Sequence, residues 1–126
     1  MTAQRPAPVY LNLLRIRFPV GAVTSIGHRI AGVLLFMSLP FLVYLLELSL
    51  QGPRGFDRAV ATMQNGWFKI AVALLVWSLL HHLLSGIRFL LIDIERGVTL
   101  QQARRSAWLV NMLAPVMTLA CVWWLL

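Results

Sequence analysis

The sequence predicts an all-α membrane protein with three transmembrane helices, on the basis of its composition and of three apolar stretches. Hydrophobic residues make up 60% of the 126 residues and charged residues only 12%, and the mean hydropathy is +0.78. A typical soluble domain carries about twice this share of charge. The stretches 30–50, 68–92 and 107–126 can each cross a hydrocarbon core, which takes about 20 helical residues. We therefore expect a single membrane-anchor domain over 1–126, in which 1–29 form an N-terminal segment and the start of the first helix.

The first apolar stretch is expected to stay in the mature protein as an anchor. Arginines and prolines interrupt the residues before it, and no small-residue cleavage site follows a short apolar core, as a signal peptide would require. Serine is too scarce there for an organelle transit sequence. The simplest location is therefore a bacterial cytoplasmic (inner) membrane, which the chain would cross several times.

The basic residues predict the orientation in the membrane. They fall into two groups, of which the first comprises Arg5, Arg15, Arg17, Arg96, Arg104 and Arg105, and the second Arg54, Arg58 and Lys69. Since cytoplasmic loops carry the excess of Lys and Arg, the N-terminus is expected inside and the C-terminus outside. The net charge of +7 lies at such juxtamembrane positions, where it suits lipid head groups rather than nucleic acid.

A first polar cluster lies at the start of the first helix. Ser25, His28, Arg29 and Gly32 are spaced i, i+3, i+4 and i+7, which places them on one helical face. A hydroxyl, an imidazole and a guanidinium beside a glycine could bind a carbonyl oxygen or a carboxylate at the membrane surface. Alternatively, His28 and Arg29 reach the lipid head groups and Ser25 caps the helix.

A second polar cluster contains two adjacent histidines in the second helix. A titratable imidazole within a membrane span indicates a functional site. His81 and His82 point about 100° apart, so only one of them can serve a given centre. His82 and Gly86 share a face, on which glycine leaves space for a flat group such as haem beside an axial imidazole. The alternative is a packed histidine that hydrogen-bonds to another helix.

The sequence gives little support for metal catalysis or for nucleophilic catalysis. No carboxylate stands at ligand spacing from His81 or His82, and the one cysteine, Cys121, allows no thiolate cluster. No serine is accompanied by the partners of a nucleophilic triad. We therefore expect no catalytic residue in this chain.

Taken together, the motifs resemble the cytochrome b subunit of succinate dehydrogenase. The resemblance covers nearly the whole chain and rests on Arg5-Pro6, Arg17-Phe18-Pro19, the pattern S-x-x-H-R-x-x-G at 25–32, and H-x-x-x-G-I-R at 82–88 followed by Asp93. Found together, the two patterns are specific for this family, whereas either pattern alone is weak evidence for it. The resemblance implies a membrane anchor that packs with a second anchor subunit into a haem-binding bundle, beside an iron–sulfur subunit and a flavoprotein subunit.

The resemblance also implies roles for particular residues. His82 matches the axial ligand of a haem b that is shared with the second anchor subunit, and His28 and Arg29 would lie near the haem propionates. Ser25 and Arg29 match residues that bind ubiquinone, with Phe18 and Ile26, and also Pro19, as lining. The chain would support electron transfer from succinate to quinone without binding succinate, and it would have no complete activity alone.

Two departures and two alternatives accompany this prediction. Phe89 stands where some relatives carry a further histidine, and Gly27 stands where bulkier apolar residues are usual. The anchor subunit of a fumarate reductase would have similar residues but would serve the reverse reaction. A haem-free membrane assembly or accessory protein would use His82 for packing only.

Overall fold

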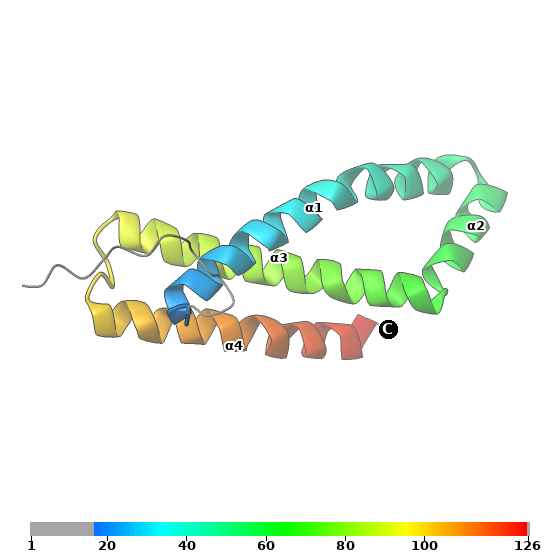
Figure 1. The fold of residues 1–126 in the computed structure, drawn as a ribbon. Helices are drawn as coiled ribbons and strands as arrows, with labels where there is room; N and C mark the ends of the chain where they lie inside the picture. The colour runs from blue at the N-terminus through cyan, green and yellow to red at the C-terminus, as the bar shows by residue number, and fades with distance from the viewer. Residues whose placement is uncertain (1–16, 126) are drawn as a thin grey trace, which may run out of the picture.

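The computed structural model describes residues 17–125, which form four helices and no strand. These are α1 (Val20–Leu50), α2 (Pro53–Met63), α3 (Gly66–Asp93) and α4 (Leu100–Leu125). Three of them, α1, α3 and α4, are long and apolar enough to cross a membrane. Figure 1 shows α2 at one end of the molecule and the turn between α3 and α4 at the other. The prediction of an all-α chain with three membrane-spanning helices is thus confirmed.

The helix boundaries differ from those predicted from hydropathy. The first helix begins at Val20, ten residues before the apolar stretch that starts at Ile30, and the third long helix begins at Leu100 rather than at Ala107. Polar residues in the first turns of α1 and α4, such as Arg29 and Arg104, lower the local hydropathy but are compatible with a helix. Hydropathy alone located the apolar part of each helix, and the expectation that the first helix starts before residue 30 agrees with the structure.

The structure also contains a short helix, α2, where an irregular link was expected. Gly52 adopts φ of 90°, and Pro53 follows as the first residue of α2, a position at which its missing N–H is harmless. Gly55 lies against the carbonyl of Leu48, so that α2 folds back tightly on the end of α1. Glycine and proline, which suggested a loop, are here the residues that begin a helix.

Local features explain where α3 and α4 begin and where α1 bends. The Asn65 side chain accepts a hydrogen bond from the backbone N–H of Trp67 at 2.9 Å and caps α3. Thr99 precedes α4, and its hydroxyl oxygen accepts from the N–H of Gln102 at 3.4 Å. Pro40 lies inside α1, and Figure 1 shows α1 bent near its middle.

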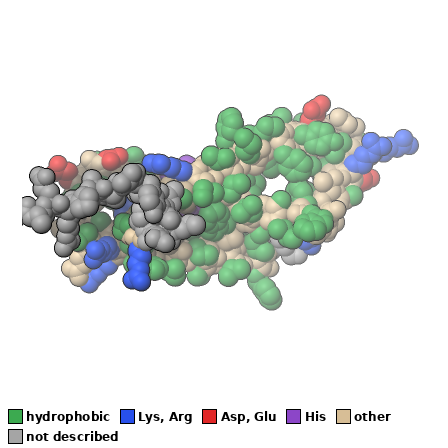
Figure 2. Space-filling view, viewed as in Figure 1, with side chains coloured by type: hydrophobic (Ala, Val, Ile, Leu, Met, Phe, Trp, Pro, Cys, Tyr) green, Lys and Arg blue, Asp and Glu red, His purple; other side chains and the backbone are tan. Residues whose placement is uncertain are grey.

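Small side chains allow the three long helices to pack closely. The α3 helix packs against both α1 and α4. The fully buried residues at these contacts are small, namely Thr24, Ala31, Ser78, Ser85, Ala107 and Ala114. Large apolar side chains point outward instead, and Figure 2 shows charged side chains gathered toward the two ends. This distribution is that of a membrane protein, whose outer surface contacts lipid or other apolar surfaces.

Candidate functional site

The first polar cluster lies within α1, on the helical face that its spacing predicted. Ser25 and His28 are half-buried and Arg29 is exposed. Neither the Ser25 hydroxyl nor the Arg29 guanidinium forms a hydrogen bond with another residue in the described part of the chain.

His82 is held against this face of α1 by its Nδ1 atom. This nitrogen lies 3.1 Å from the backbone carbonyl oxygen of His28. A carbonyl oxygen can only accept, so the hydrogen bond requires a hydrogen on Nδ1. In the neutral imidazole the other nitrogen, Nε2, is then unprotonated and carries the lone pair that a metal ligand needs.

The imidazole of His28 stacks on that of His82. The two ring centroids are 4.0 Å apart with an interplanar angle of 12°. The ring centroid of Phe89 lies 5.3 Å from that of His28 in an edge-on contact. Phe89 therefore places an apolar ring, and no polar group, beside His28. His82 is thus fixed by a hydrogen bond on its edge and by a ring on its face.

Of the two glycines near these rings, Gly32 leaves room for His82. A Cβ atom on Gly32 would lie 3.0 Å from Cε1 and 3.3 Å from Nδ1 of His82, which is tighter than an ordinary contact. A Cβ atom on Gly86 would meet the Nε2 atom of His28 at 3.8 Å, an ordinary van der Waals contact. The sequence suggested that Gly86 clears space beside His82, whereas the glycine that does so most directly is Gly32 on the other helix.

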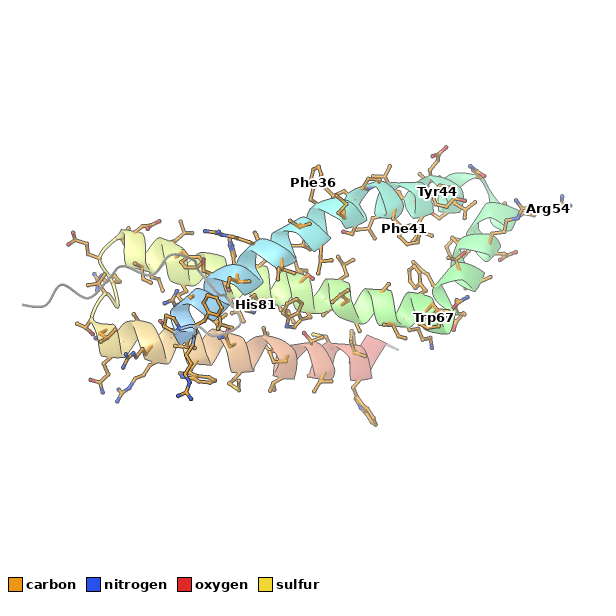
Figure 3. All side chains as sticks on the ribbon, viewed as in Figure 1. Phe36, Phe41, Tyr44, Arg54, Trp67 and His81 are labelled. Carbon is orange, nitrogen blue, oxygen red and sulfur yellow. The ribbon has the colours of Figure 1, made fainter. Side chains whose placement is uncertain are left out.

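His81 has a different environment from its neighbour. His81 is 4% exposed, and its ring stacks on that of Trp77 with 5.2 Å between the centroids. Its buried Nε2 atom has no hydrogen-bond partner among the described residues. A Cβ atom on Gly27 would lie only 2.5 Å from that nitrogen. Figure 3 shows His81 near the point where α1 crosses α3 and α4. The two imidazoles therefore serve different surroundings, as their adjacent positions predicted.

The residues expected to line a quinone site do not all border the same cavity in the structure. Phe18 lines a cavity of about 420 Å³ beside His81, together with residues of α1, α3 and α4. Ile26 is 44% exposed and does not line this cavity. Ser25 and Arg29 do not line it either.

Sequence reasoning missed two polar contacts of the site region. Arg88 is 8% exposed and donates from Nε to the Ser106 hydroxyl at 3.0 Å and from Nη2 to the carbonyl of Ala103 at 3.1 Å. It therefore joins α3 to α4. Thr24 donates to Oδ1 of Asn111 at 3.1 Å and joins α1 to α4. Both pairs join residues on different helices, and no local pattern indicates them.

The residues 17–125 contain no cluster of three His, Cys, Asp or Glu side chains that could hold a metal ion by themselves. A metal bound through His82 would therefore need a cofactor or a second chain for its other ligands. The fold and this site together define a class of protein, a multi-span helical membrane subunit with a histidine-containing polar site between its first two spans.

Comparison with known proteins narrows this class. Residues 1–124 match the model of the succinate dehydrogenase/fumarate reductase transmembrane subunit family. The chain is 37% identical to the succinate dehydrogenase cytochrome b556 subunit of Coxiella burnetii over 98% of both chains. It is 30% identical to the subunit of the same name from Paracoccus denitrificans, over 82% of this chain and 78% of the relative. The subunit from Rickettsia felis is 26% identical, over 92% and 89% respectively.

The chain therefore belongs to the succinate dehydrogenase/fumarate reductase transmembrane subunit family. The resemblance identified from the sequence motifs is confirmed, and the match extends over almost the full length. The chain is a membrane-embedded subunit of such a complex.

Proposed function

We propose that this chain is the cytochrome b anchor subunit of a succinate dehydrogenase, in which it holds haem b and forms part of a ubiquinone site. The observation that supports this most strongly is the nearly full-length match to subunits named succinate dehydrogenase cytochrome b556. As such a subunit the chain binds no succinate, and it depends on a flavoprotein and an iron–sulfur subunit for electrons. The N-terminus is inside and the C-terminus outside in a bacterial inner membrane.

His82 is the residue that we propose as this chain's axial ligand to haem b. The hydrogen bond from Nδ1 to the His28 carbonyl leaves Nε2 unprotonated and restrains the ring, which suits an axial imidazole. His81 suits it less, because its Nε2 atom is buried against Gly27. When bound, haem b would supply a one-electron carrier. Its other histidine ligand would come from the second anchor subunit.

The proposal predicts different results for the two adjacent histidines. His82→Ala removes the axial nitrogen, so the purified complex should lose its low-spin b-type absorption band. His81→Ala should retain the band, which makes it the matched control on the same helix. A band that survives in His82→Ala would contradict the ligand assignment.

Ser25 and Arg29 are the proposed quinone-binding residues of this chain. Reduction of a quinone places negative charge on its carbonyl oxygens, which hydrogen-bond donors and a fixed cation stabilise. The Ser25 hydroxyl can donate to one oxygen, and the exposed Arg29 supplies the positive charge. His28 and Arg29 are also the residues that we propose near the haem propionates. Phe18 and Ile26 remain proposed lining residues, although only Phe18 borders a cavity within this chain.

The quinone assignment predicts a separation of two activities. Arg29→Ala or Ser25→Ala should depress succinate-dependent quinone reduction by about a hundredfold if one donor to the developing charge is lost. Succinate oxidation with an artificial acceptor should persist, because that reaction takes place in other subunits. Quinone reduction that stays unchanged in both variants would contradict the assignment, whereas an equal loss of both activities would indicate failed assembly.

A further inference from the structure

Arg88 is a buried positive charge for which the described part of the chain provides no negative partner. It is 8% exposed and is the only Lys, Arg, Asp or Glu side chain in that part of the chain that is buried. Its two hydrogen-bond partners, the Ser106 hydroxyl and the Ala103 carbonyl, are neutral. The acidic residues nearest in sequence, Asp93 and Glu95, are both exposed. Since a buried charge is costly unless an opposite charge compensates it, an anion from outside the chain should stand beside Arg88.

Arg88 lines a cavity of about 300 Å³ between the end of α3 and the start of α4. Arg96, in the turn between these helices, lines the same cavity, whereas neither Asp93 nor Glu95 does. Two arginines and no acidic residue therefore border one space. The apolar walls are formed by Leu84, Ile87, Leu91, Ile92 and Leu109. This combination suits a molecule that has both an anionic group and an apolar part.

The polar and apolar parts of the cavity follow the order of a lipid leaflet. Arg96 lies beyond the end of α3, and Arg88 lies five residues, or about 8 Å, before that end at Asp93. Leu84 lies a further turn into α3, and Leu109 lies nine residues beyond the start of α4. The two positive groups are therefore near the depth of lipid head groups, and the apolar walls extend toward the hydrocarbon core.

The cavity lies on the opposite side of α3 from the proposed haem ligand. Leu84 and Leu91 are two and nine residues from His82, so they point about 160° and 180° away from it around the helix. Neither Ser25 nor Arg29 lines the cavity. Leu91 is 46% exposed on this side, where the helix surface is open to lipid. A molecule in this cavity would therefore be separate from haem and quinone.

We propose that this cavity binds a phospholipid whose head group carries a net negative charge. The phosphate would lie between Arg88 and Arg96, and an acyl chain would follow the leucine and isoleucine walls. The Nη1 group of Arg88, which donates to no described residue, would donate to a phosphate oxygen, since guanidinium and phosphate match in geometry and charge. Basic pockets between transmembrane helices typically bind such head groups. This inference goes beyond the proposed function, because it requires neither haem nor quinone.

The test measures lipid binding to the complete complex, delipidated in a maltoside detergent and titrated with dioleoylphosphatidylglycerol. Native mass spectrometry reports the bound lipid. We expect a saturable site whose affinity falls roughly fivefold in Arg96→Gln, the contribution of one cation near a membrane surface. Arg105→Gln is the matched control, because Arg105 is exposed on α4 and does not line the cavity. Its affinity should equal that of the unmodified complex.

A second pair of variants tests the apolar walls. Ile87→Trp should fill the cavity and abolish the saturable site. Leu90→Trp, at an exposed position of the same helix outside the cavity, should retain it. Co-purification of the other subunits shows that each variant has assembled. If Ile87→Trp does not assemble, the two arginine variants still decide the matter.

Competition identifies the source of the phosphate. An excess of inorganic phosphate should leave the lipid bound, because it cannot use the apolar walls. Dioleoylphosphatidylcholine should bind more weakly, since its choline cation would stand near two arginines. Displacement by inorganic phosphate, or equal lipid affinities in Arg96→Gln and Arg105→Gln, would overturn the proposal. A structure of the complex with a neighbouring subunit's acidic side chain beside Arg88 would also overturn it.

Discussion

At the scale of single residues, the site depends on glycines as much as on histidines. Gly32 has no Cβ atom where His82 approaches within close contact distance, and Gly27 has none where His81 is buried. The sequence predicted that His28 lies in the first long helix and that His81 and His82 have different surroundings, as the structure shows, whereas the proposed roles of these residues stay predictions. It could not indicate the carbonyl of His28 as a partner, because a backbone oxygen has no sequence signature.

A substitution at Gly32 should disturb His82 without removing it. In Gly32→Ala the new Cβ atom would lie 3.0 Å from Cε1 of His82, so the ring must tilt or shift by a few tenths of an ångström. We expect a shifted haem absorption band, or a changed midpoint potential, in a complex that still assembles. Gly21→Ala on the same helix is the control, since its Cβ atom would make only an ordinary contact at 3.8 Å. Identical spectra for both variants would contradict the role of Gly32.

At the scale of helices, α3 is the element that connects the others. Its residue His82 contacts the backbone of α1, and its residue Arg88 contacts α4. The sequence predicted the three long helices because apolar runs of this length have few alternatives. It did not predict the polar first turns of α4, nor α2, because α2 depends on how Gly52, Pro53 and Gly55 pack against α1.

The contact between α3 and α4 should be sensitive to the loss of a single hydroxyl. Ser106→Ala removes the partner of the Arg88 Nε atom and leaves a buried charged donor unpaired. Such a loss typically costs about 1–3 kcal/mol. We expect a lower midpoint for thermal dissociation of the complex, followed by loss of the haem band.

Ser38→Ala provides the comparison for this measurement. The Ser38 hydroxyl donates only to the carbonyl of Leu35 in its own helix, at 2.7 Å, so no buried donor is left unpaired on its removal. The midpoint for thermal dissociation of the Ser38→Ala complex should stay close to that of the unmodified complex. Equal destabilisation by the two variants would show that the Arg88 contact contributes nothing specific.

At the scale of the whole molecule, the chain exposes apolar side chains around most of its length. Phe36, Tyr44 and Trp67 are exposed along α1 and at the start of α3, and Figure 3 shows them at the periphery. Composition alone predicted this class of protein. The proposed haem and quinone sites could be predicted from this sequence only in part, since the second axial histidine and the other quinone contacts would belong to neighbouring chains.

The proposed orientation can be tested with cysteine labelling in intact cells. In a Cys121→Ala background, Gln64→Cys lies between α2 and α3 and Gln101→Cys lies at the start of α4, and both positions are exposed. A membrane-impermeant maleimide added outside spheroplasts should label Gln64→Cys and spare Gln101→Cys, because the arginine-rich side is inside. The reverse pattern would overturn the orientation.

The contact between Gly27 and His81 also limits which side chains can stand at position 27 of this chain. These positions lie on different helices but share one small volume, since the imidazole fills the space that a side chain at position 27 would need. A larger residue at position 27 would require the residue at position 81 to become smaller or to turn away. Substitutions at the two positions should therefore not be independent in their effects on stability.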